Sequence, residues 1–340
     1  FMDPVDYTAA LDHKFTEETE PCVLYFAGKL YDGVQTRVRG QSARYWPKPP
    51  WKFYTPQGHN FAAPQVFDRT VDTFNLQANY ADKSYLREML AWETMRDVGH
   101  PYNQARPARV QQNGSFFGLF NFLEDTDRDW SIRNRIDPEG TRYKAFQDCR
   151  PQPTPEDLVD LYEKQYPEDG DHSDLYAFLT DLSGLTDQQL KDFLFDNVDI
   201  PAMLNYLAAQ SVMHGNDHLY KNYFLYRDTY GTQRWRMLAW DLDLTFGRNW
   251  VWDSLSDEIW ADLDYVAGLP GVAPSHPLFG NSDHTKLNGT WNRLIDRVLD
   301  DSDIQEMYYR RLRSLMDQLL VTGRYEARID ELAAMIAPEA

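Results

Sequence analysis

The chain has 340 residues, of which 42% are hydrophobic, enough to bury one large core or two adjoining lobes. Its 53 acidic and 34 basic residues give a net charge of −19, which argues against a general nucleic-acid surface. No apolar run approaches the length of a membrane span, and no signal peptide is recognisable. The two cysteines, Cys22 and Cys149, form no metal-ligand pattern, and the sequence leaves open whether they pair.

The first 150 residues are predicted to form mainly strands with one helix. Strands are expected at residues 23–26, 35–39, 51–54, 109–112 and 116–122. The last two are joined by Asn113-Gly114, a strong signal for a hairpin turn. The helix is expected over residues 84–98, with Ser84 as its N-cap. A proline-rich stretch at residues 151–155 then marks a boundary.

Beyond this boundary the pattern is mainly helical. Helices are expected at residues 156–165, 175–182, 187–195, 200–213, 291–299, 303–320 and 325–336. A hairpin of strands 220–226 and 234–242 interrupts them, and residues 251–288 are predicted to be irregular. We therefore expect an α+β protein with a two-lobed, protein kinase-like fold: a strand-rich N-lobe with one helix over residues 1–150, and a helical C-lobe over residues 151–340.

The predicted hairpin carries the residues with the strongest chemical signal. Asp217 precedes Asn222 by five positions, and Asp241 and Asp243 stand at the end of the second strand. This order and spacing are those of a kinase-type phosphoryl-transfer site. Asp217 is predicted to serve the hydroxyl nucleophile, while Asn222 and Asp241, with Asp243, hold magnesium. Strand alternation places Asp241 and Asp243 on one face, where a cation would relieve their repulsion.

Such a site also needs a lysine on a strand of the first lobe, held by an acid from a helix. Lys48 and Lys52 both qualify, and Lys52, which lies within a predicted strand, is the first choice. Glu93 falls on the apolar face of the predicted helix and is its predicted partner, whereas Glu88 falls on the opposite side. Glu124 ends the Asn-Gly hairpin, where either a contact to the nucleotide or a linker role is open.

Together these residues resemble the CotH kinase family, a group of atypical, secreted or surface-associated kinases. The matching segments are residues 39–42 (RGQS), 47–52 (PKPPWK), 82–87 (DKSYLR), 113–120 (NGSFFGLF) with Glu124, 216–217 (ND), 221–226 (KNYFLY), 240–243 (WDLD) and 246–247 (FG). The resemblance implies ATP and Mg²⁺ as cofactors, with Asp217 as the catalytic-loop acid and Asn222 and Asp241 as metal ligands. It also implies a phosphate-pairing lysine, Lys52 or Lys48. The family usually has Asn in place of Gln41.

Three functions follow as hypotheses. The first is transfer of the ATP γ-phosphate to a hydroxyl group, a Ser or Thr of a protein substrate whose identity the sequence does not give. The second is transfer of AMP on the same fold. The third is a non-catalytic module for surface adhesion or assembly, against which the intact set of Asp217, Asn222 and Asp241 argues. The resemblance implies an extracellular, cell-surface or spore-surface location.

Overall fold

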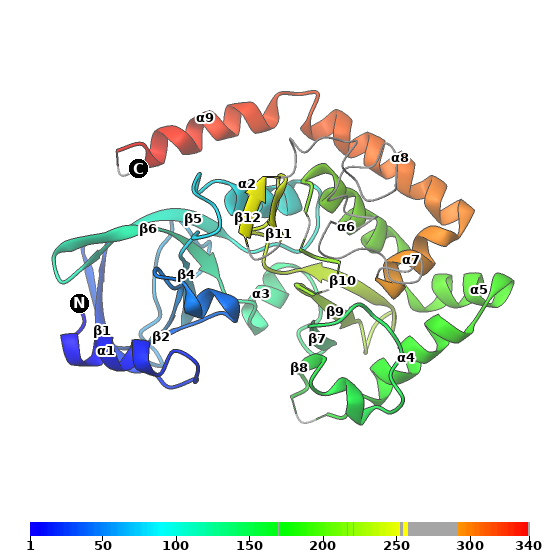
Figure 1. Ribbon diagram of the computed structural model, residues 1–340, viewed down its shortest axis with the longest axis horizontal. Coiled ribbons are helices and arrows are strands. Elements are labelled where there is room, and N and C mark those ends of the chain that lie inside the picture. The colour runs from blue at the N-terminus through cyan, green and yellow to red at the C-terminus, as the bar shows by residue number, and fades with distance from the viewer. Residues whose placement is uncertain (169, 216, 220, 252–253, 258–291, 339–340) are drawn as a thin grey trace. The chain divides into compact units, whose positions relative to one another are not determined.

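A computed structural model describes residues 1–168, 170–215, 217–219, 221–251, 254–257 and 292–338 (Figure 1). The protein is a mixed α/β chain with antiparallel sheets and helices. It divides into two compact units: unit 1 comprises residues 1–92, 103–130 and 328–340, and unit 2 comprises residues 93–102 and 131–327. None of the helices in the described ranges is both long and apolar enough to span a bilayer.

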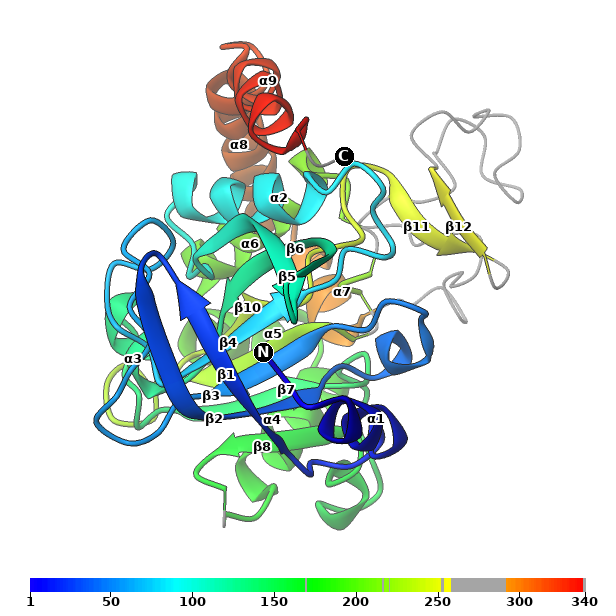
Figure 2. The ribbon, with the colours of Figure 1, turned by 90° about the vertical axis from the view of Figure 1, so that its left-hand side faces the viewer.

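Unit 1 is built on a six-stranded antiparallel sheet with the order β1-β2-β3-β4-β6-β5 (Figure 2). Its strands are β1 (Glu20–Phe26), β2 (Lys29–Val38), β3 (Trp51–Tyr54), β4 (Thr73–Gln77), β5 (Ala105–Gln112) and β6 (Ser115–Glu124). The predicted Asn113-Gly114 hairpin joins β5 to β6, and the predicted strand 51–54 is β3. The N-terminal helix α1 (Pro4–Asp12), which was not predicted, packs against β1 and β2.

One face of this sheet packs a phenylalanine core. Phe53 of β3 stacks on Phe74 of β4 with ring centroids 5.1 Å apart, and Phe61 stacks on Phe74 at 4.4 Å. Because side chains alternate along a strand, the neighbouring residues of β3 and β4 point to the other face. That second face is polar.

The helix α2 (Arg87–Asp97) begins three positions after the predicted cap, Ser84. The Asp82 carboxylate accepts hydrogen bonds from the backbone N–H groups of Ser84, Leu86 and Arg87 and pairs with the Arg87 guanidinium at 2.6 Å. This carboxylate satisfies backbone amides just before and at the first residue of the helix and complements the helix dipole.

Unit 2 contains a four-stranded antiparallel sheet with the order β10-β9-β7-β8. Its strands are β7 (Thr141–Ala145), β8 (Tyr162–Tyr166), β9 (Tyr223–Arg227) and β10 (Trp235–Ala239). The predicted break at residue 150 falls inside unit 2, because β7 pairs with both β8 and β9.

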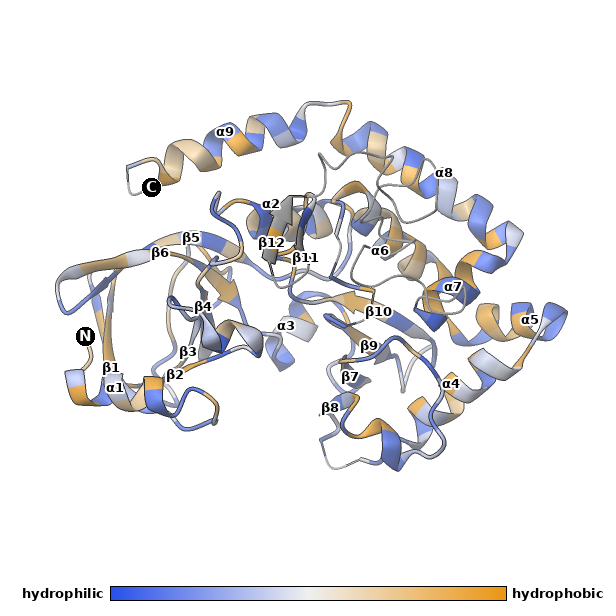
Figure 3. Cartoon of the chain, in the orientation of Figure 1, coloured by the Kyte–Doolittle hydropathy of each residue, from blue (hydrophilic) through white to orange (hydrophobic). Residues whose placement is uncertain are grey.

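The helices that belong to unit 2 are α4 (Ser173–Gly184), α5 (Asp187–Asn197), α6 (Ile200–Val212), α7 (Arg293–Asp300) and α8 (Ser302–Leu319). α6 packs against β10 and α8. Hydrophobic and hydrophilic residues alternate along α8, as expected for a helix with one buried side (Figure 3). The remaining elements are α3 (Arg128–Arg133), α9 (Arg324–Ile336) and the two-stranded ladder of β11 (Arg248–Val251) and β12 (Ser254–Asp257).

The predicted helix over residues 156–165 is wrong. This segment forms a short 3-10 turn (Glu156–Leu158) and then β8, which pairs with β7. Leu158 and Tyr162 are both fully buried at helical spacing, so the local pattern imitated a helix that strand pairing overrides. Of the segment predicted to be irregular, residue 251 ends β11 and residues 254–257 form β12. Residues 252–253 and 258–288 lie outside the described part of the chain.

Candidate functional site

The loop between α6 and β9 carries the first group of predicted residues. His214 and Asn222, near its two ends, have φ values of 48° and 63°, in the left-handed region that costs energy for residues other than glycine. The start of the loop is tied to the segment after β10, because Phe246 N–H donates to the Met213 carbonyl at 2.5 Å. Strained backbone of this kind is concentrated at functional sites in proteins.

Asp217 and Asn222 meet within this loop. Asn222 Nδ2 donates to Asp217 Oδ2 at 2.6 Å. Burial raises the pKa of the Asp217 carboxyl to about 7; the charge of Asp241 adds to this effect, while Lys221 and the Asn222 hydrogen bond oppose it. A carboxylate whose pKa lies near neutrality is suited to accept a proton from a reacting group.

Asp241 and Asp243 do not lie on a strand. β10 ends at Ala239, and Asp241 has a φ of 56°, so the strand-alternation argument for a shared face was wrong. Asp243 is 7% exposed, whereas Asp241 is only partly buried. Asp241 is the acid whose charge acts on Asp217. The structure therefore brings Asp217, Asn222 and Asp241 into one electrostatic group.

The donor set of this group fits magnesium held jointly with a nucleotide. Among the residues that the structure describes, no three His, Cys, Asp or Glu side chains converge into a ready-made metal cage. Mg²⁺ does not require one, since it usually takes one or two protein oxygens together with phosphates and water. The Asp241 carboxylate and the Asn222 amide oxygen are hard ligands of this kind. A cation here would also relieve the repulsion between Asp217 and Asp241.

The polar face of the unit 1 sheet carries the second group. Arg37, Lys52 and Asn75 stand opposite one another on β2, β3 and β4. Further along the same face, Arg39 Nη1 donates to Gln77 Oε1 at 3.0 Å. The Arg37 guanidinium already pairs with the Glu17 carboxylate. Lys52 and Arg39, beside the carboxamides of Asn75 and Gln77, give this face the chemistry to bind an anion.

Lys52 has a different partner from the predicted one. Its Nζ lies 2.9 Å from Asp125 Oδ2, and Asn75 Nδ2 donates to the other oxygen of Asp125 at 3.1 Å. Glu93 instead lies 3.8 Å from Arg324 Nη2. Lys52 and Glu93 thus each have an ion-pair partner within their own unit.

The helical-wheel argument failed because α2 is buried on several sides. Met89, Leu90 and Trp92 are each no more than 3% exposed. Glu88, predicted to point away from the core, is 1% exposed, and its Oε2 accepts a hydrogen bond from Asn121 Nδ2 at 3.3 Å. A helix with apolar residues around most of its circumference gives no single apolar stripe from which to place an acid.

Lys48 precedes β3 and lies among aromatic groups. Its Nζ is 4.2 Å from the centroid of Phe120 and 5.0 Å from that of Tyr85, and it donates to the Leu119 carbonyl. Burial, and to a smaller extent the charge of Lys83, lowers the pKa of Lys48 to about 8. Lys48 is therefore packed against aromatic rings and a backbone carbonyl within unit 1.

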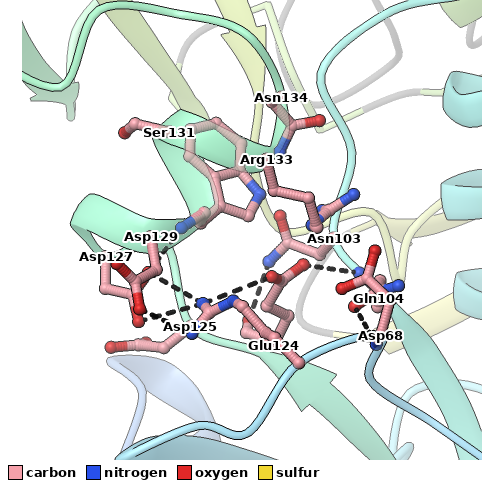
Figure 4. Close-up of polar contacts among 12 residues, drawn as sticks. Asp68, Asn103, Gln104, Glu124, Asp125, Asp127, Asp129, Ser131, Arg133 and Asn134 are labelled. Carbon is pink, nitrogen blue, oxygen red and sulfur yellow. Dashed lines mark hydrogen bonds and ion pairs between the residues drawn. The ribbon is translucent and has the colours of Figure 1, made fainter. Parts of the chain in front are cut away.

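Glu124 ends β6 and is fully buried (Figure 4). Its carboxylate lies 3.4 Å from Arg69 Nη2 and accepts a hydrogen bond from Gln104 N–H at 3.0 Å. Its carbonyl accepts a hydrogen bond from Asn103 Nδ2 at 2.9 Å. Of the two roles that the sequence left open, these contacts favour the structural one, since they join the strand end to neighbouring segments.

Sequence reasoning gave no role to several polar residues of unit 1, namely Asp125, Asn75, Arg37 and Arg39, and it placed Glu88 away from the core. The period-two alternation of polar and apolar residues in β3 and β4 was the available signal for the polar face. Nothing local marked Asp125, because it follows the end of β6 and lies 73 positions from Lys52.

Comparison with known proteins agrees with the predicted family. The family model described as CotH kinase protein matches residues 36–340. The inner spore coat protein H of Bacillus subtilis (strain 168) is 22% identical over 345 aligned positions, which cover 99% of this chain and 86% of that protein. Since the family model matches most of the sequence, the chain belongs to the CotH kinase family.

Proposed function

We propose that the chain is an ATP- and Mg²⁺-dependent phosphotransferase that moves the γ-phosphoryl group of ATP to a hydroxyl group, a Ser or Thr of a protein. The observation that carries this proposal is the group of Asp217, Asn222 and Asp241, in which Asp217 has its pKa raised to about 7. Family membership supports the same chemistry at the level of the family name.

Asp217 has the role of the base in this reaction. It orients the acceptor hydroxyl and takes its proton while the hydroxyl oxygen bonds to the γ-phosphorus and the bond to the β–γ bridging oxygen breaks, leaving ADP. Asn222 and Asp241 hold the metal, which when bound neutralises charge on the phosphates. The reaction needs no covalent intermediate on the protein.

Unit 1 supplies the cations in this proposal. Lys52, fixed by Asp125, pairs with phosphate oxygens, and Arg39, which donates to Gln77, adds positive charge on the same face. In a chain of net charge −19, such a local group of cations is needed to admit an anionic nucleotide. We propose the two-lobed kinase organisation from membership of the CotH kinase family, and a spore- or cell-surface location from the relative that is a spore coat protein.

Three alanine variants test the assignment: Asp217→Ala, Asp241→Ala and, as control, Asp196→Ala, which removes an exposed acid of α5. We expect both site variants to abolish transfer of label from γ-labelled ATP to protein. Asp217→Ala should bind Mg·ATP as the wild type does, because the acid serves the acceptor, whereas Asp241→Ala should bind it more weakly. Calorimetric titration separates the two, and the control should match the wild type throughout.

The position of the label in ATP also discriminates between phosphoryl transfer and the alternative functions. Transfer from α-labelled but not γ-labelled ATP would replace phosphoryl transfer with AMP transfer. Failure of the wild type to bind Mg·ATP or to transfer either label would favour a non-catalytic adhesion or assembly module. Binding in Asp241→Ala identical to that of the wild type would contradict the metal role.

A further inference from the structure

Asn292 is a fully buried amide at the N-cap of α7 (Figure 1). Its Oδ1 accepts hydrogen bonds from the backbone N–H groups of Leu294 and Ile295 at 3.1 and 3.2 Å. Its Nδ2 donates to the Leu219 carbonyl at 2.9 Å and to the Tyr223 hydroxyl at 3.2 Å. Two acceptor sites and two donors are thus all used, which is the full hydrogen-bonding capacity of a carboxamide.

Of the two groups that Asn292 holds, one lies inside the proposed catalytic loop and the other directly follows it. Leu219 follows Asp217 by two positions, and Tyr223 follows Asn222 directly. Among the described residues, Asn292 is the hydrogen-bond donor to the Leu219 carbonyl. The loop's position therefore depends on a residue that is distant in sequence.

Asn292 is itself held by a buried network that leads into the sheet of unit 2. The Tyr223 hydroxyl donates to the Gln147 carbonyl and lies 3.3 Å from Cys149 Sγ. The N–H of Arg293, the next residue, donates to the Asp148 carbonyl at 2.7 Å. Residues 147–149 follow β7, so the start of α7 is fixed to the sheet.

We propose that Asn292 is a positioning residue for the catalytic loop: by holding Leu219 and Tyr223 it keeps Asp217 and Asn222 in the arrangement that the transfer step requires. This inference rests on the proposed function. Its physical basis is that a side chain one contact removed from a catalytic group fixes the geometry of that group, and small displacements of a reacting group reduce the rate strongly.

A pair of serine substitutions at two helix caps separates positioning from helix capping. Serine still caps a helix, but Asn292→Ser cannot supply the amide donor to Leu219. Asp301→Ser is the matched control, because Asp301 caps α8 through Asp303 N–H and Ile304 N–H in the same way. We expect Asn292→Ser to lower kcat about tenfold or more with KM for ATP unchanged, and Asp301→Ser to leave both unchanged.

Hydrogen–deuterium exchange over residues 214–223 gives a readout that does not depend on activity. This segment should exchange faster in Asn292→Ser and at the wild-type rate in Asp301→Ser. Asn292→Asp serves as a second variant of equal size: it keeps the cap but places an acceptor against the Leu219 carbonyl, so it should show the same fall in kcat and the same faster exchange. Thermal unfolding of each variant shows that the variant is folded at the temperature at which kcat and exchange are measured.

The outcomes distinguish this inference from the proposed function. If the wild type transfers phosphate and Asp217→Ala does not, while both Asn292 variants keep wild-type kcat and wild-type loop exchange, the positioning role is overturned. If the wild type shows no transfer, the proposed function fails instead. In that case, unchanged exchange in the Asn292 variants would still refute the anchoring of the loop.

Discussion

Lys48 and Lys52 lie close in sequence but in different electrostatic surroundings. Lys52 Nζ faces the Asp125 carboxylate at 2.9 Å, while Lys48 Nζ faces the Phe120 ring, the Tyr85 ring and a backbone carbonyl. The Asp125 carboxylate compensates the charge of Lys52, whereas no acid in the described part of the chain compensates the burial of the Lys48 amine among the rings. This contrast makes Lys52 the better candidate for pairing with phosphate.

The Lys52–Asp125 pair should contribute measurably to folding. Burial alone would raise the pKa of the Asp125 carboxyl, but Lys52 and Asn75 hold this pKa below its ordinary value. We expect Lys52→Met to lower the free energy of unfolding at pH 7 by about 1.5–3 kcal/mol, the range for a hydrogen bond to a charged group. Lys29→Met, at the exposed start of β2, is the control and should change little.

The pH dependence gives this prediction its sign. A carboxyl with a depressed pKa in the folded state stabilises the protein above its ordinary pKa and loses that contribution as the pH falls through the folded value. The stability difference between wild type and Lys52→Met should therefore shrink as denaturation is measured below pH 3.8, the ordinary value for Asp. A difference that stays constant into acid would refute the pairing.

Lys48→Met is predicted to stabilise the protein at neutral pH. Between the folded pKa of about 8 and the ordinary value of 10.5, the unfolded chain holds a proton that the folded protein lacks, so wild-type stability rises with pH across this range. A methionine of similar length packs against the same rings without this penalty. Urea denaturation at pH 7 and pH 9 should show that the advantage of the variant is larger at pH 7.

At the scale of elements, local signals decided which predictions succeeded. The Asn113-Gly114 turn, the alternation of β3 and the helices of unit 2 have patterns that lie within the element itself. The end of β10 was misplaced because Trp240 and Leu242 continue the apolar alternation, while the backbone turns at Asp241 with positive φ. The residue types around Asp241 do not predict a positive φ at this position.

The pairing of β7 with β9 yields a prediction at Gly140. A Cβ added there would lie 2.7 Å from the Arg227 carbonyl oxygen and 2.5 Å from the Tyr226 hydroxyl, and a strand backbone cannot move aside cheaply. Gly140→Ala should therefore destabilise the protein by about 1–3 kcal/mol, the usual cost of overpacking. Gly184→Ala, with nothing within 4 Å of its added Cβ, should be neutral or slightly stabilising. Denaturant unfolding of the two variants compares them, and equal stabilities would contradict the close packing.

At the scale of the whole molecule, the two units are interleaved along the chain. Unit 1 takes residues 103–130 and 328–340 in addition to residues 1–92. Sequence periodicity and a proline-rich boundary describe neighbouring residues, so they cannot reveal segments that return to a unit after a long excursion. For the same reason the spacing of Asp217, Asn222 and Asp241 was visible in the sequence, while Asp125 and Asn292 were not: their partners are 73 positions away.

The net charge of −19 makes stability depend on salt, and this background must be separated from metal binding. Self-repulsion of the folded chain is screened as the Debye length falls from roughly 30 Å at 0.01 M to 10 Å at 0.1 M ionic strength, so NaCl should raise Tm. With a non-hydrolysable ATP analogue present, MgCl₂ at matched ionic strength should raise Tm further, because the ligand binds only the folded state. The extra increase should disappear in Asp241→Asn, whereas the NaCl response should remain. Equal effects of the two salts on the wild type would argue against a magnesium site built on Asp241.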